Sequence, residues 1–334
     1  MTLKRVIARF ARGFFCLGTG AAIAALAATA SAHAQTYPAR PIRLIVSNPA
    51  GGLPDTIARL YARQLEIQMG QPFVIENRGG GNGTIAVNSL LASPADGYTF
   101  VVTDGAIFSV NPLIQANLPY KTDDFKPAGL LAISPLFLAA HPKVGVKTFP
   151  QLVAFARANP GILNYGSSGV GSAHHIAMVA IMQALKLNAT HVPFKGSGES
   201  LPALLGGHID ILFTAYTALA QPAAEKQINI LATASGARSA LDPNLPSIGE
   251  TIPDYNYGVI IGLFAHAQTP QAVLDRVAAE VTTASKLADL TERLKTIGVE
   301  AKGTDGKEHL AALQQERQHY EPLLQAVGLT VSAR

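Results

Sequence analysis

The 334-residue sequence has no tryptophan, a single cysteine and few charged residues, which make up 14% of the chain. The lone Cys16 lies in the first 34 residues, so the rest of the chain has no thiol for a disulfide, a nucleophile or a metal site. Residues 1–34 hold four of the 26 Lys and Arg and none of the 22 Asp and Glu. The formal net charge of +4 therefore belongs to residues 1–34, and the neutral remainder gives no basis for nucleic-acid binding.

Residues 1–34 have the three parts of a secretory signal peptide. The basic residues are Lys4, Arg5, Arg9 and Arg12. An apolar stretch, Gly13 to Ala30, follows them and leads to the small-residue cleavage site Ser31-Ala32-His33-Ala34. A membrane anchor is the alternative, but the apolar run is short and interrupted by glycine and threonine. We predict cleavage after Ala34 and export to the periplasm, and we find no later segment that could span a membrane.

Short apolar runs rich in β-branched residues alternate with longer segments of helical period, which predicts an α/β fold. The predicted strands are Ile42–Val46, Phe73–Glu76, Tyr98–Thr103, Gly129–Ile133, Leu136–Ala140, His191–Phe194, Ile209–Phe213, Ile228–Thr233 and Val259–Ala265. The predicted helices include Phe149–Ala158, Ala173–Leu185 and Ser200–Leu205. The tail is predicted to be almost all helix. One tail helix would start at Pro270 after a Thr269 cap, and helices would stop at Gly298 and Gly328.

Loops that follow strands are the candidate sites, because ligands of α/β sheets bind beyond the carboxyl ends of strands. Loop one, Asn48–Asp55, has two adjacent glycines whose amides would bind an anion, with Asp55 capping the next helix. Loop two, Thr103–Ile107, offers a hydroxyl, a carboxylate and the Gly105 amide. For each loop the alternative is a purely structural turn.

Loop three, Tyr165–His174, places glycines and three serine hydroxyls at the start of a helix and predicts an oxyanion cradle. It lacks the dinucleotide fingerprint, because His174 stands at the third glycine position. It also lacks the nucleophile elbow, because Gly166–Val170 does not end in glycine. After the strand His191–Phe194, Lys195 is either a counter-charge for an anion or a solvated surface charge.

Metal and catalytic sites have little support in the sequence. His174 and His175 are adjacent and would point about 100° apart on a helix, so both cannot face one ion. We expect no metal, no other cofactor and no catalysis. A periplasmic α/β hydrolase stays open as an alternative, with Ser168 or Ser172 as nucleophile and a distant histidine, because triad members lie far apart in sequence.

Short motifs recur along the chain in the order known from one family. They are Tyr37-Pro38-x-Arg40-Pro41-Ile42, Pro49–Gly52 with Asp55, Glu76-Asn77-Arg78, Ala95–Thr99, Asn159-Pro160-Gly161, Leu163-Asn164-Tyr165, His191–Gly196 and Leu204–Gly207. With these motifs the chain resembles the Bug (TctC-like) family, the periplasmic solute receptors of tripartite tricarboxylate transporters, over residues 37–328.

The resemblance implies a type II periplasmic-binding-protein fold, in which two α/β lobes joined by two crossover strands close on a small carboxylate. The crossings fall near Pro135 and Tyr255, so residues 35–135 plus 255–334, including the helical tail, form lobe 1 and residues 136–254 form lobe 2. Carried over to this sequence, the ligand-binding residues are Asn48, Pro49, Ala50, Gly51, Gly52, Thr103 and Gly105 on one wall, and Ser168, Gly169, Gly171 and Ser172 on the facing wall, with Thr214 added.

The chain departs from the family pattern at three places. Leu53-Pro54 replace Gly-Thr after the glycine pair, and Thr214-Ala215 replace an Asp-Asn pair. Phe108 stands where a polar residue is common, which would make the distal pocket more apolar. These changes favour a carboxylate with an uncharged or partly aromatic remainder.

The family also implies the partners. The receptor would deliver its carboxylate to a tripartite tricarboxylate-type membrane permease, and the alternative is a receptor that meets a sensor-kinase ectodomain. We expect a monomer and no nucleic-acid partner.

Overall fold

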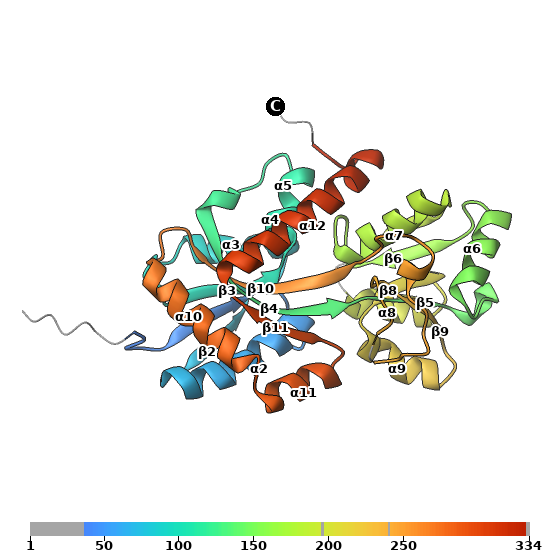
Figure 1. Cartoon of the computed structure of the whole chain (residues 1–334). Helices are drawn as coiled ribbons and strands as arrows, with labels where there is room; N and C mark the ends of the chain where they lie inside the picture. The colour runs from blue at the N-terminus through green and yellow to red at the C-terminus, as the bar shows by residue number, and fades with distance from the viewer. Residues whose placement is uncertain (1–36, 195–196, 240, 332–334) are drawn as a thin grey trace, which may run out of the picture. The chain divides into compact units, whose positions relative to one another are not determined.

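Two β-sheets organise the protein, and each mixes parallel with antiparallel strands (Figure 1). The structure, a computed structural model, describes residues 37–194, 197–239 and 241–331. The described residues from Arg40 on form one compact unit. The predicted signal peptide and Lys195 lie outside the described residues, which contain no helix that is long and apolar enough to cross a membrane.

The first sheet has the strand order β11-β4-β10-β3-β1-β2, and the second has the order β7-β6-β8-β5-β9. The strands of the first sheet are β1 Ile42–Val46, β2 Phe73–Asn77, β3 Thr99–Asp104, β4 Phe125–Pro135, β10 Gly258–His266 and β11 Glu300–Thr304. Those of the second are β5 Phe137–Ala140, β6 Asn164–Ser167, β7 Thr190–Pro193, β8 Ile211–Thr214 and β9 Asn229–Thr233. β1 is parallel to β2 and β3, and β6 is parallel to β7 and β8. The carboxyl ends of these strands therefore lie at one edge of each sheet.

Helices cover the sheets, and the N-terminal residues of α2, α6, α7 and α12 explain where these helices begin. The helices are α2 Leu53–Met69, α3 Thr84–Leu91, α4 Ala106–Ser109, α5 Asn111–Ile114, α6 Phe149–Ala158, α7 Ala173–Leu185, α8 Ser197–Leu205, α9 Tyr216–Ala224, α10 Gln271–Ala284, α11 Ala288–Thr296 and α12 Gly306–Ala326. The side chains of Thr148, Ser172 and Asp305 accept hydrogen bonds from the first turns of α6, α7 and α12. Pro54 lies in the first turn of α2, where its missing N–H costs nothing.

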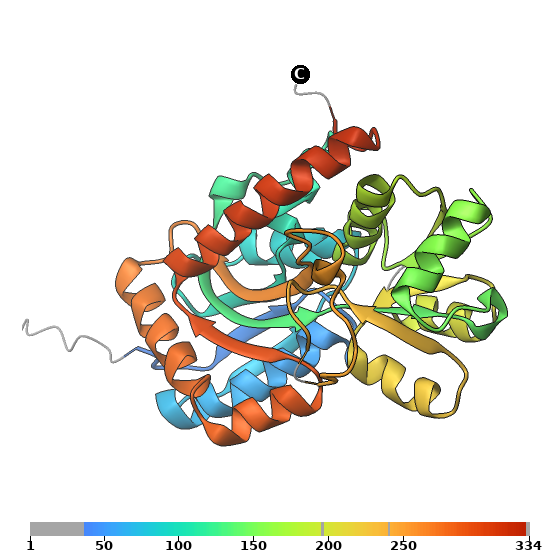
Figure 2. The same ribbon diagram turned by 45° about the vertical axis from the view of Figure 1, so that its right-hand side comes forward.

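The chain passes between the sheets at two points. β4 ends at Pro135 in the first sheet and β5 begins at Phe137 in the second, and the chain returns through residues 234–257 to β10. Figures 1 and 2 show α12 lying along the first sheet with its C-terminal end toward α7. One buried cluster joins Val110 and Leu113 near α4 and α5, Ile176 of α7, and Leu324 of α12. Apolar packing therefore ties together helices that follow strands of both sheets.

The sequence analysis is wrong at several elements. The tail is not almost all helix, because β11 forms the edge of the first sheet beside β4. Residues 164–167, placed at the start of loop three, form β6 between two strands. α10 begins at Gln271 with Pro270 as its N-cap, one residue later than predicted. The predicted stops are confirmed, since Gly298 and Gly328 have φ of 73° and 71° just after α11 and α12.

Candidate functional site

Loop one is held in shape by the carboxylate of Asp55, which is 2% exposed. Asp55 is not the N-cap that we predicted, because α2 begins at Leu53 and Gly52 occupies the cap position. From inside the first turn, Asp55 Oδ2 accepts hydrogen bonds from the Gly51 amide and from Arg59 Nε, both at 2.9 Å. Burial raises the pKa of Asp55, but these donors together with Asn77 outweigh it and hold the pKa below its ordinary value.

The neighbouring strand β2 locks the same loop through Asn77. Its Nδ2 donates to Asp55 Oδ1 at 2.8 Å and to the carbonyl oxygen of Asn48 at 2.9 Å. The Gly52 amide donates to the carbonyl oxygen of Pro49 at 3.1 Å. The two glycine amides that we expected to meet an anion are thus occupied within the loop. Pro49, Ala50 and Gly51 form its exposed tip.

Thr103 lies beside loop one, because β1 and β3 are parallel neighbours. Its side chain is 1% exposed, and among the described residues its hydroxyl has no hydrogen-bond partner. Gly83, with φ of 87°, closes over it: a Cβ placed there would lie 3.2 Å from Thr103 Oγ1 and 3.9 Å from Ser47 Cβ. The structure therefore brings Thr103 and the start of loop one together.

Gly105 faces the other way, toward α12. Its amide donates to the carbonyl oxygen of Ile260 at 3.0 Å, and a Cβ placed on it would lie 2.5 Å from Glu316 Oε2. Ser109 Oγ donates to the same Glu316 oxygen at 2.5 Å. Burial raises the pKa of Glu316 to about 7, and the nearby carboxylate of Asp104 adds to this shift. Loop two thus carries a half-buried acidic cluster, Asp104 and Glu316, on its α12 side.

Loop three is folded around the N-terminus of α7. Ser172 Oγ accepts from the His175 amide at 3.3 Å and donates to the carbonyl oxygen of Gly169 at 2.8 Å. The Gly171 amide donates to His175 Nδ1 at 3.1 Å. Gly169 and Gly171 have φ of 121° and 77°, which side chains with a Cβ rarely adopt. The glycines are therefore required by the backbone path of the loop.

A stack of three rings lies behind loop three. The rings of Tyr165 and His191 are 4.9 Å apart, and those of His191 and His175 are 4.0 Å apart. Ser167 Oγ is 2.7 Å from His191 Nε2. Burial lowers the pKa of His175 to about 4 and also lowers that of His191, so both imidazoles are neutral at neutral pH. Sequence reasoning missed this stack, because its members come from β6, β7 and α7.

Gly171 is the point at which loop three meets the helices that follow loop two. A Cβ on Gly171 would lie 2.5 Å from Ile114 Cδ1 and 2.9 Å from Val110 Cγ1. Thr214 is 2% exposed at the end of β8, on the same sheet edge as Ser167. The side-chain hydrogen bonds of Ser172 stay within loop three and the first turn of α7.

Phe108 does not have the surroundings that we predicted. Its ring packs edge-on against Phe125 at 6.5 Å, in the apolar cluster that also holds Tyr120. The chain around Phe108 forms the short helix α4, and this half-buried side chain packs at the edge of that cluster. It therefore gives no support to a more apolar ligand pocket.

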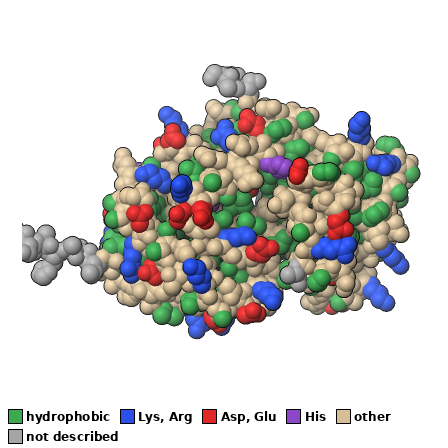
Figure 3. Space-filling model, viewed as in Figure 1, with side chains coloured by type: hydrophobic (Ala, Val, Ile, Leu, Met, Phe, Trp, Pro, Cys, Tyr) green, Lys and Arg blue, Asp and Glu red, His purple; other side chains and the backbone are tan. Residues whose placement is uncertain are grey.

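The contacts of the candidate serines in the structure give no support to the hydrolase alternative. The serine hydroxyl that contacts a histidine ring is that of Ser167, which is 0% exposed. Ser172 instead caps α7. Within the described residues, no group of three or more His, Cys, Asp or Glu is placed to hold a metal ion. On the face in Figure 3, charged side chains of both signs are scattered and do not form a patch of one sign.

The protein has the type II periplasmic-binding-protein fold. Its two mixed sheets, the chain crossings between them and the glycine-rich strand ends are those of this fold. Residues 57–329 match the family described as the tripartite tricarboxylate transporter family receptor (TctC), and the chain belongs to this family. The chain is 33% identical over 312 residues to a UPF0065 protein of Bordetella pertussis, and the match covers 92% of this chain and 96% of the relative.

Two solved structures resemble it closely. R. palustris Rpa4515 with adipate has a TM-score of 0.82 and 29% identity, and the match covers 88% of this chain and 99% of the other. MatC (Rpa3494) from Rhodopseudomonas palustris with bound malate has a TM-score of 0.76 and 26% identity, and the match covers 86% and 100%. The family resemblance and the fold class stated from the sequence are confirmed.

Proposed function

We propose that the protein is a periplasmic receptor that captures a small carboxylate between two lobes and delivers it to a tripartite tricarboxylate-type membrane transporter. The observation that carries this proposal is the family match over residues 57–329. Relatives of the same fold were solved with adipate and malate, both small dicarboxylates, which supports the ligand class.

The lobes of this proposal are residues 35–135 plus 255–334, and residues 136–254. They would move about the crossings near Pro135 and Tyr255, and the ligand would stabilise the closed form by binding it better than the open form. One wall is formed by Asn48, Pro49, Ala50, Gly51, Gly52 and Thr103. Gly105 is left out of this wall, because its amide is bonded to Ile260 and it faces Glu316 of α12. The other wall is formed by Ser168, Gly169, Gly171, Ser172 and Thr214.

The hydrogen bonds within loop one suggest how it would contact the ligand. The amides of Gly51 and Gly52 are already bonded inside the loop, and Asp55 is kept ionised by Arg59 and Asn77. A carboxylate placed directly on these amides would have to displace Asp55 from the Gly51 amide and the Pro49 carbonyl oxygen from the Gly52 amide. We propose that the ligand meets the exposed tip at Pro49 and Ala50 through ordered water. The Thr103 hydroxyl would then gain the partner that it lacks.

Thr214 supports the prediction that the part of the ligand beyond its carboxylate carries no charge. A buried threonine offers a hydroxyl, and it cannot balance the charge of a ligand ammonium group as an aspartate would. The contacts of Phe108 do not support the other part of that prediction, because the half-buried ring packs against Phe125 at the edge of an apolar cluster. We therefore propose a carboxylate without an amine.

Thermal unfolding tests this function. The protein purified from the periplasm would be screened against mono-, di- and tricarboxylates, aromatic acids and amino acids. A ligand at about 100 times its Kd adds roughly 2.7 kcal/mol, which raises Tm by on the order of 5 °C. We expect a shift with a few carboxylates. No shift with any of them, or the largest shift with an amino acid, would contradict the proposal.

Export and delivery need separate tests. N-terminal sequencing of the periplasmic protein should find Gln35 first, and an intact Met1 would contradict cleavage after Ala34. Deletion of the adjacent or co-expressed permease should abolish uptake of the bound carboxylate. Uptake that continues without the permease, together with loss of the transcriptional response to the carboxylate when the receptor itself is deleted, would favour a sensor-kinase partner instead.

A further inference from the structure

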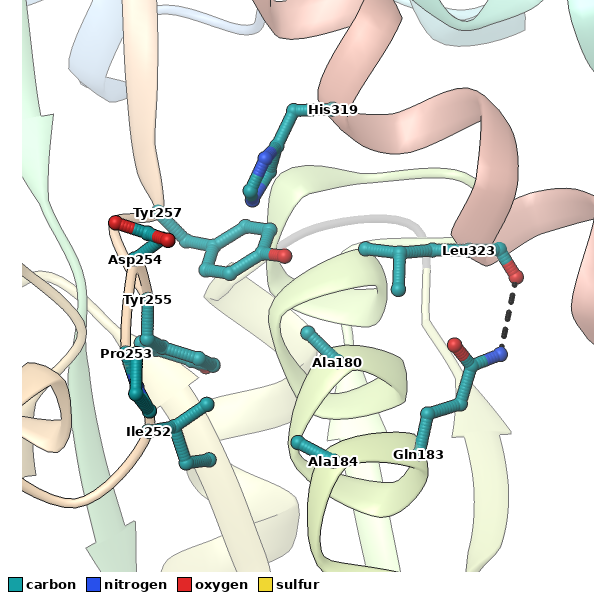
Figure 4. Close-up of a pocket in the computed structure, with 10 residues that line it drawn as sticks. All are labelled: Ala180, Gln183, Ala184, Ile252, Pro253, Asp254, Tyr255, Tyr257, His319 and Leu323. Carbon is teal, nitrogen blue, oxygen red and sulfur yellow. Dashed lines mark hydrogen bonds between the residues drawn. The ribbon is translucent and has the colours of Figure 1, made fainter.

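A cavity of about 370 Å³ lies between α7, α12 and the segment 252–257 (Figure 4). None of the proposed carboxylate-binding residues lines it. Ala180 and Ala184 lie one turn apart on α7 and leave room where larger side chains would close the space. At its edge Gln183 donates to the carbonyl oxygen of Leu323 at 3.4 Å, so the side of the cavity between α7 and α12 is held in place.

Aromatic rings form one wall of the cavity. Tyr255 and Tyr257 are 2% and 4% exposed, and their ring centroids are 4.6 Å apart. Tyr255 is fixed by a hydrogen bond from its hydroxyl to the carbonyl oxygen of Ala177 at 2.8 Å. His319 of α12 lies over Tyr257 with a ring separation of 5.0 Å. In Figure 4 the Tyr257 hydroxyl points toward Leu323. Such a wall suits an aromatic ring or a cation.

The charged side chain at this cavity is the exposed carboxylate of Asp254, which lies at its rim. Figure 4 shows the carboxylate of Asp254 beside Tyr257, and no lysine or arginine lines the cavity. Burial lowers the pKa of His319 more than the Asp254 carboxylate raises it, so the imidazole is neutral at neutral pH. The charge of Asp254 is therefore not balanced by the histidine beside it. An anion has no partner here, whereas a cation does.

We propose that this cavity is a second binding site, for a small molecule that joins an aromatic ring to a positively charged amine. The ring would lie against Tyr257 and the α7 alanines, and the ammonium group would pair with Asp254. The site is chemically opposite to the proposed carboxylate site, and its occupation does not depend on that function.

Calorimetric titration of the full protein with 2-phenylethylamine tests this site, and 3-phenylpropanoate serves as the ligand of opposite charge. We expect saturable binding of the amine that depends on Asp254, whereas any binding of the acid at the proposed carboxylate site should be the same in Asp254→Asn and in the unaltered protein. Asp254→Asn should weaken binding of the amine about threefold to fivefold, because an exposed ion pair is lost. Asp254 has φ of 60°, which asparagine tolerates well, so this variant should fold. Asp123→Asn, an exposed acid outside the cavity, is the matched control.

A second variant, Ala184→Phe, should abolish amine binding by filling the cavity, with an unchanged circular dichroism spectrum as its folding check. No binding of the amine would overturn the proposal. So would equal binding in Asp254→Asn and in the unaltered protein, or displacement of the amine by the carboxylate that binds best. Because the amine is titrated without any carboxylate, failure of the proposed receptor function would not affect the result.

Discussion

Asp55 shows how a single carboxylate organises the loop at the end of β1. It is buried, yet it is paired with Arg59 and accepts hydrogen bonds from Gly51 and Asn77. A buried charge with several partners is costly to remove, because the partners lose their acceptor and remain desolvated. The shape of loop one therefore depends on this residue more than on its glycines.

We expect Asp55→Ala to lower the free energy of unfolding by on the order of 3 kcal/mol and to weaken carboxylate binding. Asp289→Ala is the matched control. Asp289 pairs with Arg293 at the same helical spacing but is 56% exposed, so its loss should cost less than about 1 kcal/mol. Denaturant unfolding of both variants measures the difference, and equal effects would show that the loop does not rely on Asp55.

The raised pKa of Glu316 predicts that the free energy of unfolding depends on pH. Glu316 faces Ser109, Asp104 and Tyr320, and its pKa is raised from an ordinary 4.5 to about 7, mainly by burial. The folded state holds this proton more tightly than the unfolded chain does. Its contribution to stability is therefore complete below about pH 4.5 and is lost as the pH rises through 7.

In the unaltered protein, the free energy of unfolding should fall by on the order of 3 kcal/mol between pH 5 and pH 7.5. In Glu316→Gln this decrease should be much smaller. Glu308→Gln removes a charge from an exposed position of the same helix and serves as control. Chemical unfolding across this pH range gives the two slopes. If Glu316→Gln keeps the original slope, the acidic cluster is not protonated as we expect.

At the scale of elements, the α/β pattern could be predicted from the sequence because most strands contain a short apolar run, such as Ile42–Val46 and Phe137–Ala140. β1, α6 and α7 begin and end where the sequence analysis placed them. β11 could not be found, because Glu300–Thr304 is a polar edge strand with one buried residue. β6 was hidden by Gly166 and Ser167, which are typical of turns but lie here in a central position of the second sheet.

The sequence predicted which loops form the candidate site. It did not predict the hydrogen bonds and ring contacts within those loops. Glycines at strand ends mark where the backbone turns, and Gly51, Gly169 and Gly171 do have positive φ. The sequence does not say which amides are already bonded within a loop. The ring stack of Tyr165, His175 and His191 was also out of reach, because it depends on which strands are neighbours.

Gly171→Val should disturb loop three far more than a change at an equally strained glycine. The new side chain would clash with Ile114 and Val110 and also occupy a backbone conformation with φ of 77°. We expect a clear fall in Tm and at least a tenfold loss of carboxylate affinity. Gly145→Val is the matched control, because its φ is 76° but no atom lies within 4 Å of the added Cβ.

The same series includes Ser172→Ala, which removes the α7 cap and should cost about 1 kcal/mol. Its effect on carboxylate binding should be smaller than that of Gly171→Val. Normal binding by Gly171→Val, measured by calorimetry, would exclude loop three from the wall of the site.

At the scale of the whole molecule, the two sheets are connected by the chain crossings and also by the packing of helices. α12 runs along the first sheet, and the cluster that holds Tyr320 and Leu324 also holds residues of α7. A change in the relation between the proposed lobes must therefore rearrange this packing. Small-angle scattering should show a smaller radius of gyration once a carboxylate binds, and an unchanged radius would contradict closure.

The crystal structure with the best carboxylate from the thermal screen would test the receptor function most directly. We predict one carboxylate group near Pro49, Ala50 and Thr103 and contacts from Ser168 to Ser172 on the opposite side. Density for the carboxylate in any other place, including the cavity beside Tyr257, would contradict the proposed site.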